Sequence, residues 1–146
     1  MALSDMAGHL IRRLHQQSTS VFSQRTQEAG FDLTPVQFAA LDAIYTHQGS
    51  DQAFIAEIIG YDRATIGGVI NRLVTKGLVR RVVNTQDRRS RALSLTAKGN
   101  KVRLVLLPIV QELQKEILSP LSIAEQEKLI QLIRQVALPA DTSVKT

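Results

Sequence analysis

The sequence predicts a mainly α-helical protein with one small β-hairpin. Three observations predict it. Apolar residues recur at helical spacing over most of the 146 residues. Capping residues and glycines divide this pattern into six segments. Apolar and polar residues alternate, as in a strand, only between residues 78 and 96.

Length and composition indicate one domain and exclude several kinds of chemistry. The chain has no cysteine, which excludes disulfides, thiolate metal sites and cysteine nucleophiles. The segment from Met1 to Leu14 does not resemble a signal peptide, and the longest apolar run, Leu104 to Val110, is too short to span a membrane. We therefore expect a cytoplasmic protein without a membrane partner.

The first three helices follow from local signals. A helix is expected over residues 4–28, capped by Ser4. Thr34, a first-turn proline and Gln37 form a capping box for a second helix, which Gly49 ends. A short third helix is expected over residues 51–59.

The next segment changes period. Asp62 caps a fourth helix that reaches Lys76 and is stopped by Gly77. The alternating segments 78–84 and 92–96 then predict a hairpin with a long basic tip. Two short helices joined by a tight turn and followed by such a hairpin describe a winged helix-turn-helix, which we assign to residues 33–99.

Two further helices complete the chain. One is expected over residues 97–118, kinked at Pro108. The last begins at the capping box of Ser122 and Glu125, reaches about residue 138, and is followed by a frayed tail. The stripes Val102–Ile117 and Leu129–Val136 exceed what the small winged core can cover. Residues 4–28 and 100–138 are therefore expected to form a helical dimerisation region, unless the first helix folds back over both stripes.

Charge is concentrated in one part of the chain. The formal net charge is +5, and residues 63–103 hold 11 of the 18 basic residues but one acid, Asp87. A concentrated cationic surface favours a polyanion as partner, and nucleic acid is the leading candidate. An anionic membrane is less favoured, because no long basic amphipathic helix is present.

The fourth helix has a small-residue face that suits the major groove. Ile66, Val69, Ile70 and Leu73 share one face, which leaves small and polar residues opposite. Adjacent glycines cost a helix roughly 1–2 kcal/mol, so they indicate either approach to DNA or tight packing on a neighbouring helix. In the first case the residues expected at DNA are Arg63, Ala64, Thr65, Gly67, Gly68, Asn71 and Arg72.

The basic hairpin tip suits the minor groove. Arg88, Arg89 and Arg91 surround Asp87, and a guanidinium at the end of a β-ribbon can enter a narrow groove while its neighbours bind phosphates. Asp87 is expected to accept hydrogen bonds from an adjacent arginine or from turn amides and so to hold the loop in one shape.

The segment NTQDRRSRALSLTAKG at 84–99 resembles the wing signature of the MarR (multiple antibiotic resistance regulator) family in Asp87, Arg89, Leu95, Thr96 and Gly99. LTPVQFAAL at 33–41 resembles the family's second helix. The resemblance implies a homodimer that binds a near-palindromic duplex and is often released by small aromatic acids. It makes Arg89 the minor-groove residue and Asp87 its support. The chain departs from the commoner pattern at Gly67 and Gly68, where many members have threonine and arginine.

An effector site is less directly indicated. His9, Arg13 and Gln17 follow one another along the edge of an apolar stripe, where an arginine pairs either with a carboxylate ligand or with an acid across a dimer interface. Phe38 is a candidate stacking wall or a core residue. No cofactor is expected.

The sequence contains no pattern typical of a metal site or of an enzyme active site. His9, His15 and His47 lack metal-ligand spacing, and no phosphate loop, nucleophile elbow or carboxylate pair predicts an enzyme. A constitutive or architectural DNA-binding protein without an effector remains the alternative to a ligand-responsive regulator.

Overall fold

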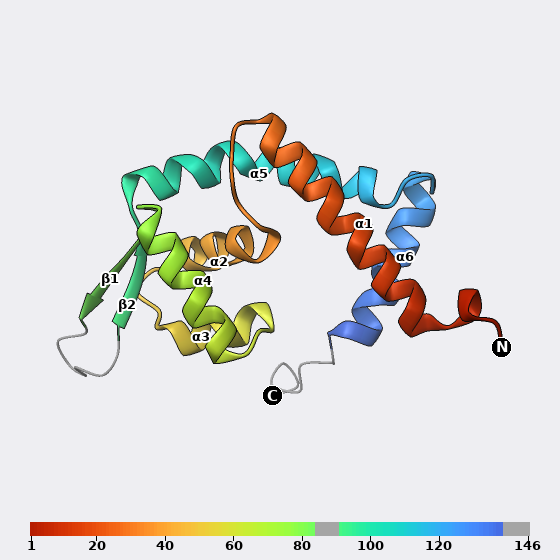
Figure 1. Cartoon of the computed structure of the whole chain (residues 1–146), viewed down its shortest axis with the longest axis horizontal. Helices are drawn as coiled ribbons and strands as arrows, with labels where there is room; N and C mark the ends of the chain where they lie inside the picture. The colour runs from red at the N-terminus through yellow and green to blue at the C-terminus, as the bar shows by residue number, and fades with distance from the viewer. Residues whose placement is uncertain (84–90, 139–146) are drawn as a thin grey trace.

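The computed structural model describes residues 1–83 and 91–138 and confirms the predicted order of elements. Figure 1 shows the hairpin at one end of the molecule, with α6 and the N-terminus at the other. The elements are a 3-10 helix (Leu3–Asp5), α1 (Ala7–Glu28), α2 (Pro35–Thr46), α3 (Gln52–Ile59), α4 (Arg63–Thr75), β1 (Val79–Val83), β2 (Arg91–Leu95), α5 (Ala97–Ile117) and α6 (Ile123–Ala137).

The predicted caps are present at three helices, and the predicted Ser4 cap is wrong. Thr34 and Ser122 form complete capping boxes, and Asp62 accepts the main-chain N–H of Thr65. Ser4 instead lies within the 3-10 helix, and Met6 occupies the N-cap of α1 without a side-chain hydrogen bond. Pro108 lies inside α5, which is continuous through it.

The root of the hairpin is fixed against α4 and α5. Val79 pairs with Leu95 in the antiparallel register of β1 and β2, and both side chains are buried. The Thr96 hydroxyl donates to the carbonyl of Gly77 at 2.6 Å and accepts the N–H of Gly99. A Cβ on Gly99 would lie 2.0 Å from the carbonyl oxygen of Leu78, so only glycine fits between α5 and the start of β1.

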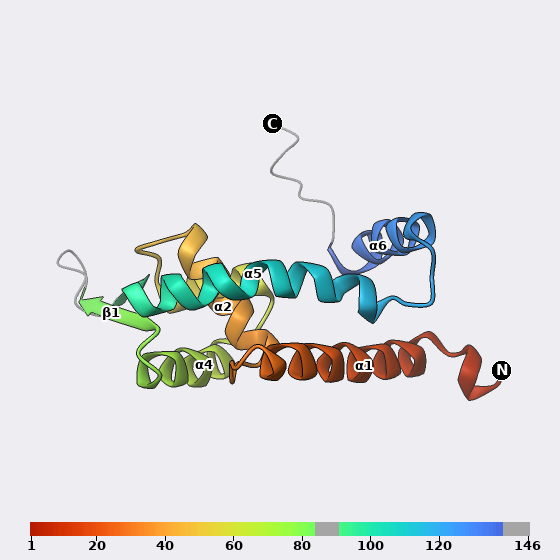
Figure 2. The ribbon, with the colours of Figure 1, turned by 90° about the horizontal axis from the view of Figure 1, so that it is seen from above.

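The apolar stripe of α5 is covered within the chain, contrary to the expectation that it awaits a partner. Figure 1 shows α1 crossing α5 obliquely, and the two helices are in contact; Figure 2 shows the same pair from above. Arg25 Nε lies 2.7 Å from Glu116 Oε2, and Gln17 Nε2 donates to the carbonyl of Ile117 at 2.9 Å. Leu106, Leu113 and Ile117 are buried and Val102 and Ile109 are half-buried. The first helix therefore folds back over the C-terminal part of this stripe, and α2 packs against α5 as well.

The stripe of α6 remains exposed. Gln126 is buried in α6, where its amide donates to the carbonyls of Leu121 and Lys115, while Ile133 and Val136 are 42% and 85% exposed. Together with outward residues of α1 these side chains form a large apolar surface.

None of the helices in residues 1–83 and 91–138 is long and apolar enough to cross a membrane.

Candidate nucleic-acid interface

Helix α4 presents one buried and one exposed face, as predicted. Ile66, Val69, Ile70 and Leu73 are buried in the core. The exposed side of α4 carries Arg63, Ala64, Thr65, Gly68, Asn71 and Arg72. Since α2, α3 and the hairpin root hold the apolar face, the opposite face is the one available to a groove.

The two adjacent glycines have different surroundings. A Cβ on Gly67 would lie 3.2 Å from Nε2 of Gln52 in α3, whereas a Cβ on Gly68 would meet no atom within 4 Å. Packing on a neighbouring helix therefore accounts in part for Gly67. It does not account for Gly68, whose helix-propensity cost has no compensating contact among the described residues.

The first turn of α4 is held by Asp62. Its carboxylate accepts the Thr65 N–H at 2.9 Å and the Thr65 hydroxyl at 2.6 Å. Both hydrogen bonds hold the pKa of Asp62 below its ordinary value, and the one from the Thr65 hydroxyl has the larger effect. The Thr65 hydroxyl proton is thus engaged, and its oxygen remains an acceptor. Arg63 and Ala64, beside it, are exposed.

Not every basic residue of the cationic segment is free to bind an anion. Lys76 Nζ donates to the carbonyl of Asp32 and to Gln37 Oε1. Arg103 pairs with Asp42 at 3.0 Å and lies 3.7 Å from the ring centroid of Tyr45. Both side chains therefore join helices to one another. The exposed bases of this segment include Arg63, Arg72, Arg80, Arg81, Lys98 and Lys101.

Arg81 joins the hairpin to α4, a contact that sequence reasoning missed. Residues 79 and 81 share one face of β1, and Val79 on that face is buried. The Arg81 guanidinium donates to Oδ1 of Asn71. Strand alternation in the sequence places Arg80 and Arg81 on opposite faces, but their distance from α4 could be known only from the packing.

The predicted wing residues lie mostly outside the described residues. Asp87, Arg88 and Arg89 belong to this group, so their assigned roles stay predictions. Arg91 lies in β2, where it pairs with Val83 in the strand register. Val82 and Val83, which lead toward the tip, are about half exposed.

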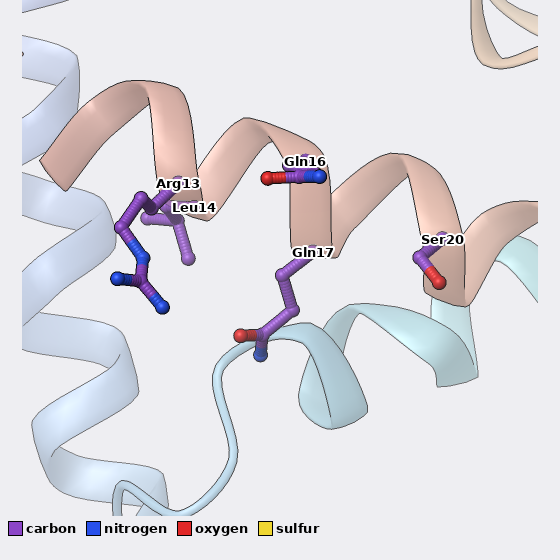
Figure 3. Close-up of a pocket in the computed structure, with 5 residues that line it drawn as sticks. All are labelled: Arg13, Leu14, Gln16, Gln17 and Ser20. Atoms are coloured by element: carbon purple, nitrogen blue, oxygen red, sulfur yellow. The ribbon is translucent and has the colours of Figure 1, made fainter. Parts of the chain in front are cut away.

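The structure brings part of the predicted effector edge of α1 to one pocket. Arg13 and Gln17 project from the same side of α1 (Figure 3) and, with Leu14, Gln16 and Ser20, line a pocket of about 420 Å³. His9, half-buried one turn earlier, does not line it. Phe38 is buried, with its ring centroid 6.3 Å from that of Phe22. This burial agrees with the core alternative for Phe38, and its role as a stacking wall stays a prediction.

The part of the chain that the structure describes contains no group of three histidine, aspartate or glutamate side chains placed to bind a metal ion. Its conspicuous chemistry is instead cationic. A helix that exposes a face of small residues, capped by an aspartate and followed by a basic hairpin, is typical of the winged-helix class of DNA-binding proteins.

Comparison with known proteins identifies the family. A family model described as the MarR family matches residues 31–90. The transcriptional regulator HosA of Escherichia coli O127:H6 is 38% identical over 136 residues, which cover 93% of this chain and 98% of HosA. The chain therefore belongs to the MarR family of transcriptional regulators.

Solved structures agree with this assignment. BpsR of Bordetella bronchiseptica, whose DNA binding is regulated by 6-hydroxynicotinic acid, is similar with a TM-score of 0.86 and 27% identity, over 97% of this chain and 99% of BpsR. The transcriptional repressor CouR, bound to a 23-mer DNA duplex, is similar with a TM-score of 0.84 and 26% identity, over 92% and 94% of the two chains.

Proposed function

We propose that the chain is a homodimeric cytoplasmic repressor that binds a near-palindromic duplex operator and releases it on binding a small aromatic carboxylate or phenol. It acts by binding alone, without catalysis. Residues 33–99 form the DNA-binding region, and residues 4–28 and 100–138 form the dimerisation region. The observation that carries the proposal is the exposed small-residue face of α4 beside a basic hairpin.

DNA is contacted in two grooves. Gly68 leaves open space over the middle of α4, which lets the helix sit deep in the major groove while Arg63, Thr65 and Asn71 reach base edges or phosphates. On the hairpin, Arg89 enters the adjacent minor groove, while Arg88 and Arg91 bind phosphates beside it. The similar repressor CouR binds a 23-mer DNA duplex, which supports double-stranded DNA as the ligand of this chain.

Dimerisation covers the apolar surface of α1 and α6. Side chains of α1, α6 and the end of α5 line a groove of about 630 Å³. Outside it, Leu10 and Ile123 are 48% and 59% exposed. A second copy related by a two-fold axis would bury this surface and would place two α4 helices about one helical turn of DNA apart.

The effector binds beside α1. Arg13 is exposed at the α1 pocket, and its guanidinium can hold a carboxylate through two parallel hydrogen bonds. Regulation of BpsR by an aromatic acid supports this ligand class. Replacement of Arg13 by methionine should abolish release by the acid while operator affinity stays unchanged.

Selection of bound sequences from a random duplex pool, repeated with aromatic acids, tests the proposal. A repressor selects one near-palindrome and prefers it to random DNA by roughly a thousandfold or more, and an acid lowers the yield. An architectural protein would select no palindrome, and none of the acids would change its thermal melting temperature.

A further inference from the structure

The contact between Arg81 and Asn71 fixes the orientation of a side chain on the exposed face of α4. Arginine only donates hydrogen bonds, so the Asn71 atom that it touches must be the carbonyl oxygen. The amide nitrogen of Asn71 is then the group left to face a ligand. Among residues 1–83 and 91–138, no acceptor pairs with that nitrogen.

Asparagine reads adenine by using both ends of its amide. The nitrogen donates to adenine N7, and the oxygen accepts from the N6 amino group. Arg81 donates to one of the two lone pairs of Asn71 Oδ1 and places a positive charge beside the other. An adenine amino group could reach only the remaining lone pair, and its hydrogens would lie next to the guanidinium cation, which weakens the pairing that an isolated asparagine makes.

Guanine offers the complementary pattern. Its major-groove edge has two acceptors, N7 and O6, and these suit the free amide N–H groups of Asn71 and the positive charge that Arg81 places beside them. We propose that Arg81 determines specificity by holding Asn71 as a donor, so that Asn71 selects guanine at the base pair it faces. This inference rests on the proposed binding of α4 in the major groove.

The position of Arg81 in the hairpin offers a matched control. Arg80 precedes it on the same strand, is also exposed, and lies on the opposite face of β1. Arg80→Met and Arg81→Met remove the same charge from adjacent positions. A general loss of attraction for phosphate would therefore affect both variants alike. The contact with Asn71 is lost only in Arg81→Met.

The test is selection from a random duplex pool with the full chain, followed by titration of duplexes that carry guanine or adenine at the affected position. Arg81→Met should shift the preference between the two bases toward adenine by about tenfold. Arg80→Met should weaken all duplexes without changing this preference. In an Asn71→Ala background, Arg81→Met should no longer shift it, because the effect acts through Asn71.

An unchanged base preference in Arg81→Met, with wild-type binding intact, overturns the inference and leaves the proposed function standing. A shift that persists in the Asn71→Ala background also overturns it. If the unaltered chain binds no duplex with sequence preference, the proposed function fails and the inference fails with it. Circular-dichroism melting of each variant separates a change in recognition from a loss of fold.

Discussion

Replacing Gly99 by alanine should destabilise the whole fold, because the new methyl group meets main chain. Its Cβ would lie 2.0 Å from the Leu78 carbonyl oxygen, where ordinary contacts begin at 3.4 Å. Leu78 cannot retreat freely, since its N–H donates to Leu73 and its carbonyl accepts from Thr96. Relief requires the start of α5 to move away from the hairpin root.

Overpacking costs typically 1–3 kcal/mol where side chains can adjust, so a clash with fixed main chain should cost about 3 kcal/mol or more. At about 2–4 °C per kcal/mol for a chain of this size, the melting temperature should fall by roughly 6–12 °C. Thermal unfolding monitored by circular dichroism measures this fall in melting temperature. The matched control is Gly68→Ala, which meets no atom within 4 Å and should raise stability by about 1 kcal/mol through helix propensity. A Gly99→Ala variant with the same melting temperature as the wild type would refute the reasoning.

Three further predictions concern DNA and acid stability. Gly68→Leu should block operator binding while the melting temperature and the dimer persist; unchanged binding would move the DNA face away from α4. Arg89→Ala and Asp87→Ala should both weaken operator binding in titrations, and uniformly tighter binding by Asp87→Ala would show that the aspartate only repels DNA. Arg25 holds the pKa of Glu116 below its ordinary value of 4.5, so their pair stabilises the fold above that pH and loses its effect as the pH falls through the lower folded value. The difference in melting temperature between the wild type and Glu116→Gln should therefore shrink below pH 4.5, and a difference that stays constant in acid would exclude this explanation.

Local signals in the sequence were sufficient for most element boundaries. The caps at Thr34, Asp62 and Ser122 were predictable because each depends on residues three positions apart. Ser4 failed as a cap because an isolated serine near a chain end can also join a 3-10 turn. The hairpin followed from the alternation of apolar and polar residues in segments 78–84 and 92–96.

Contacts between distant elements were not predictable from the pattern. The α5 stripe has the spacing of a dimer interface, yet α1 and α2 pack against it, because an apolar stripe does not specify which helix will bury it. Phe38 likewise joined the core through Phe22 of another helix. The contact of Arg81 with Asn71 depends on how the hairpin leans on α4, which strand periodicity alone does not determine.

The most direct test of the account is the salt dependence of duplex binding by the intact chain. Each phosphate contact contributes about −0.9 to the slope of log affinity against log salt. A two-fold pair of helices and basic hairpins should give a slope of about −4 or steeper, with tight binding at low salt. Absence of association, or an affinity that added salt leaves unchanged, would contradict the central claim that paired cationic surfaces hold the duplex.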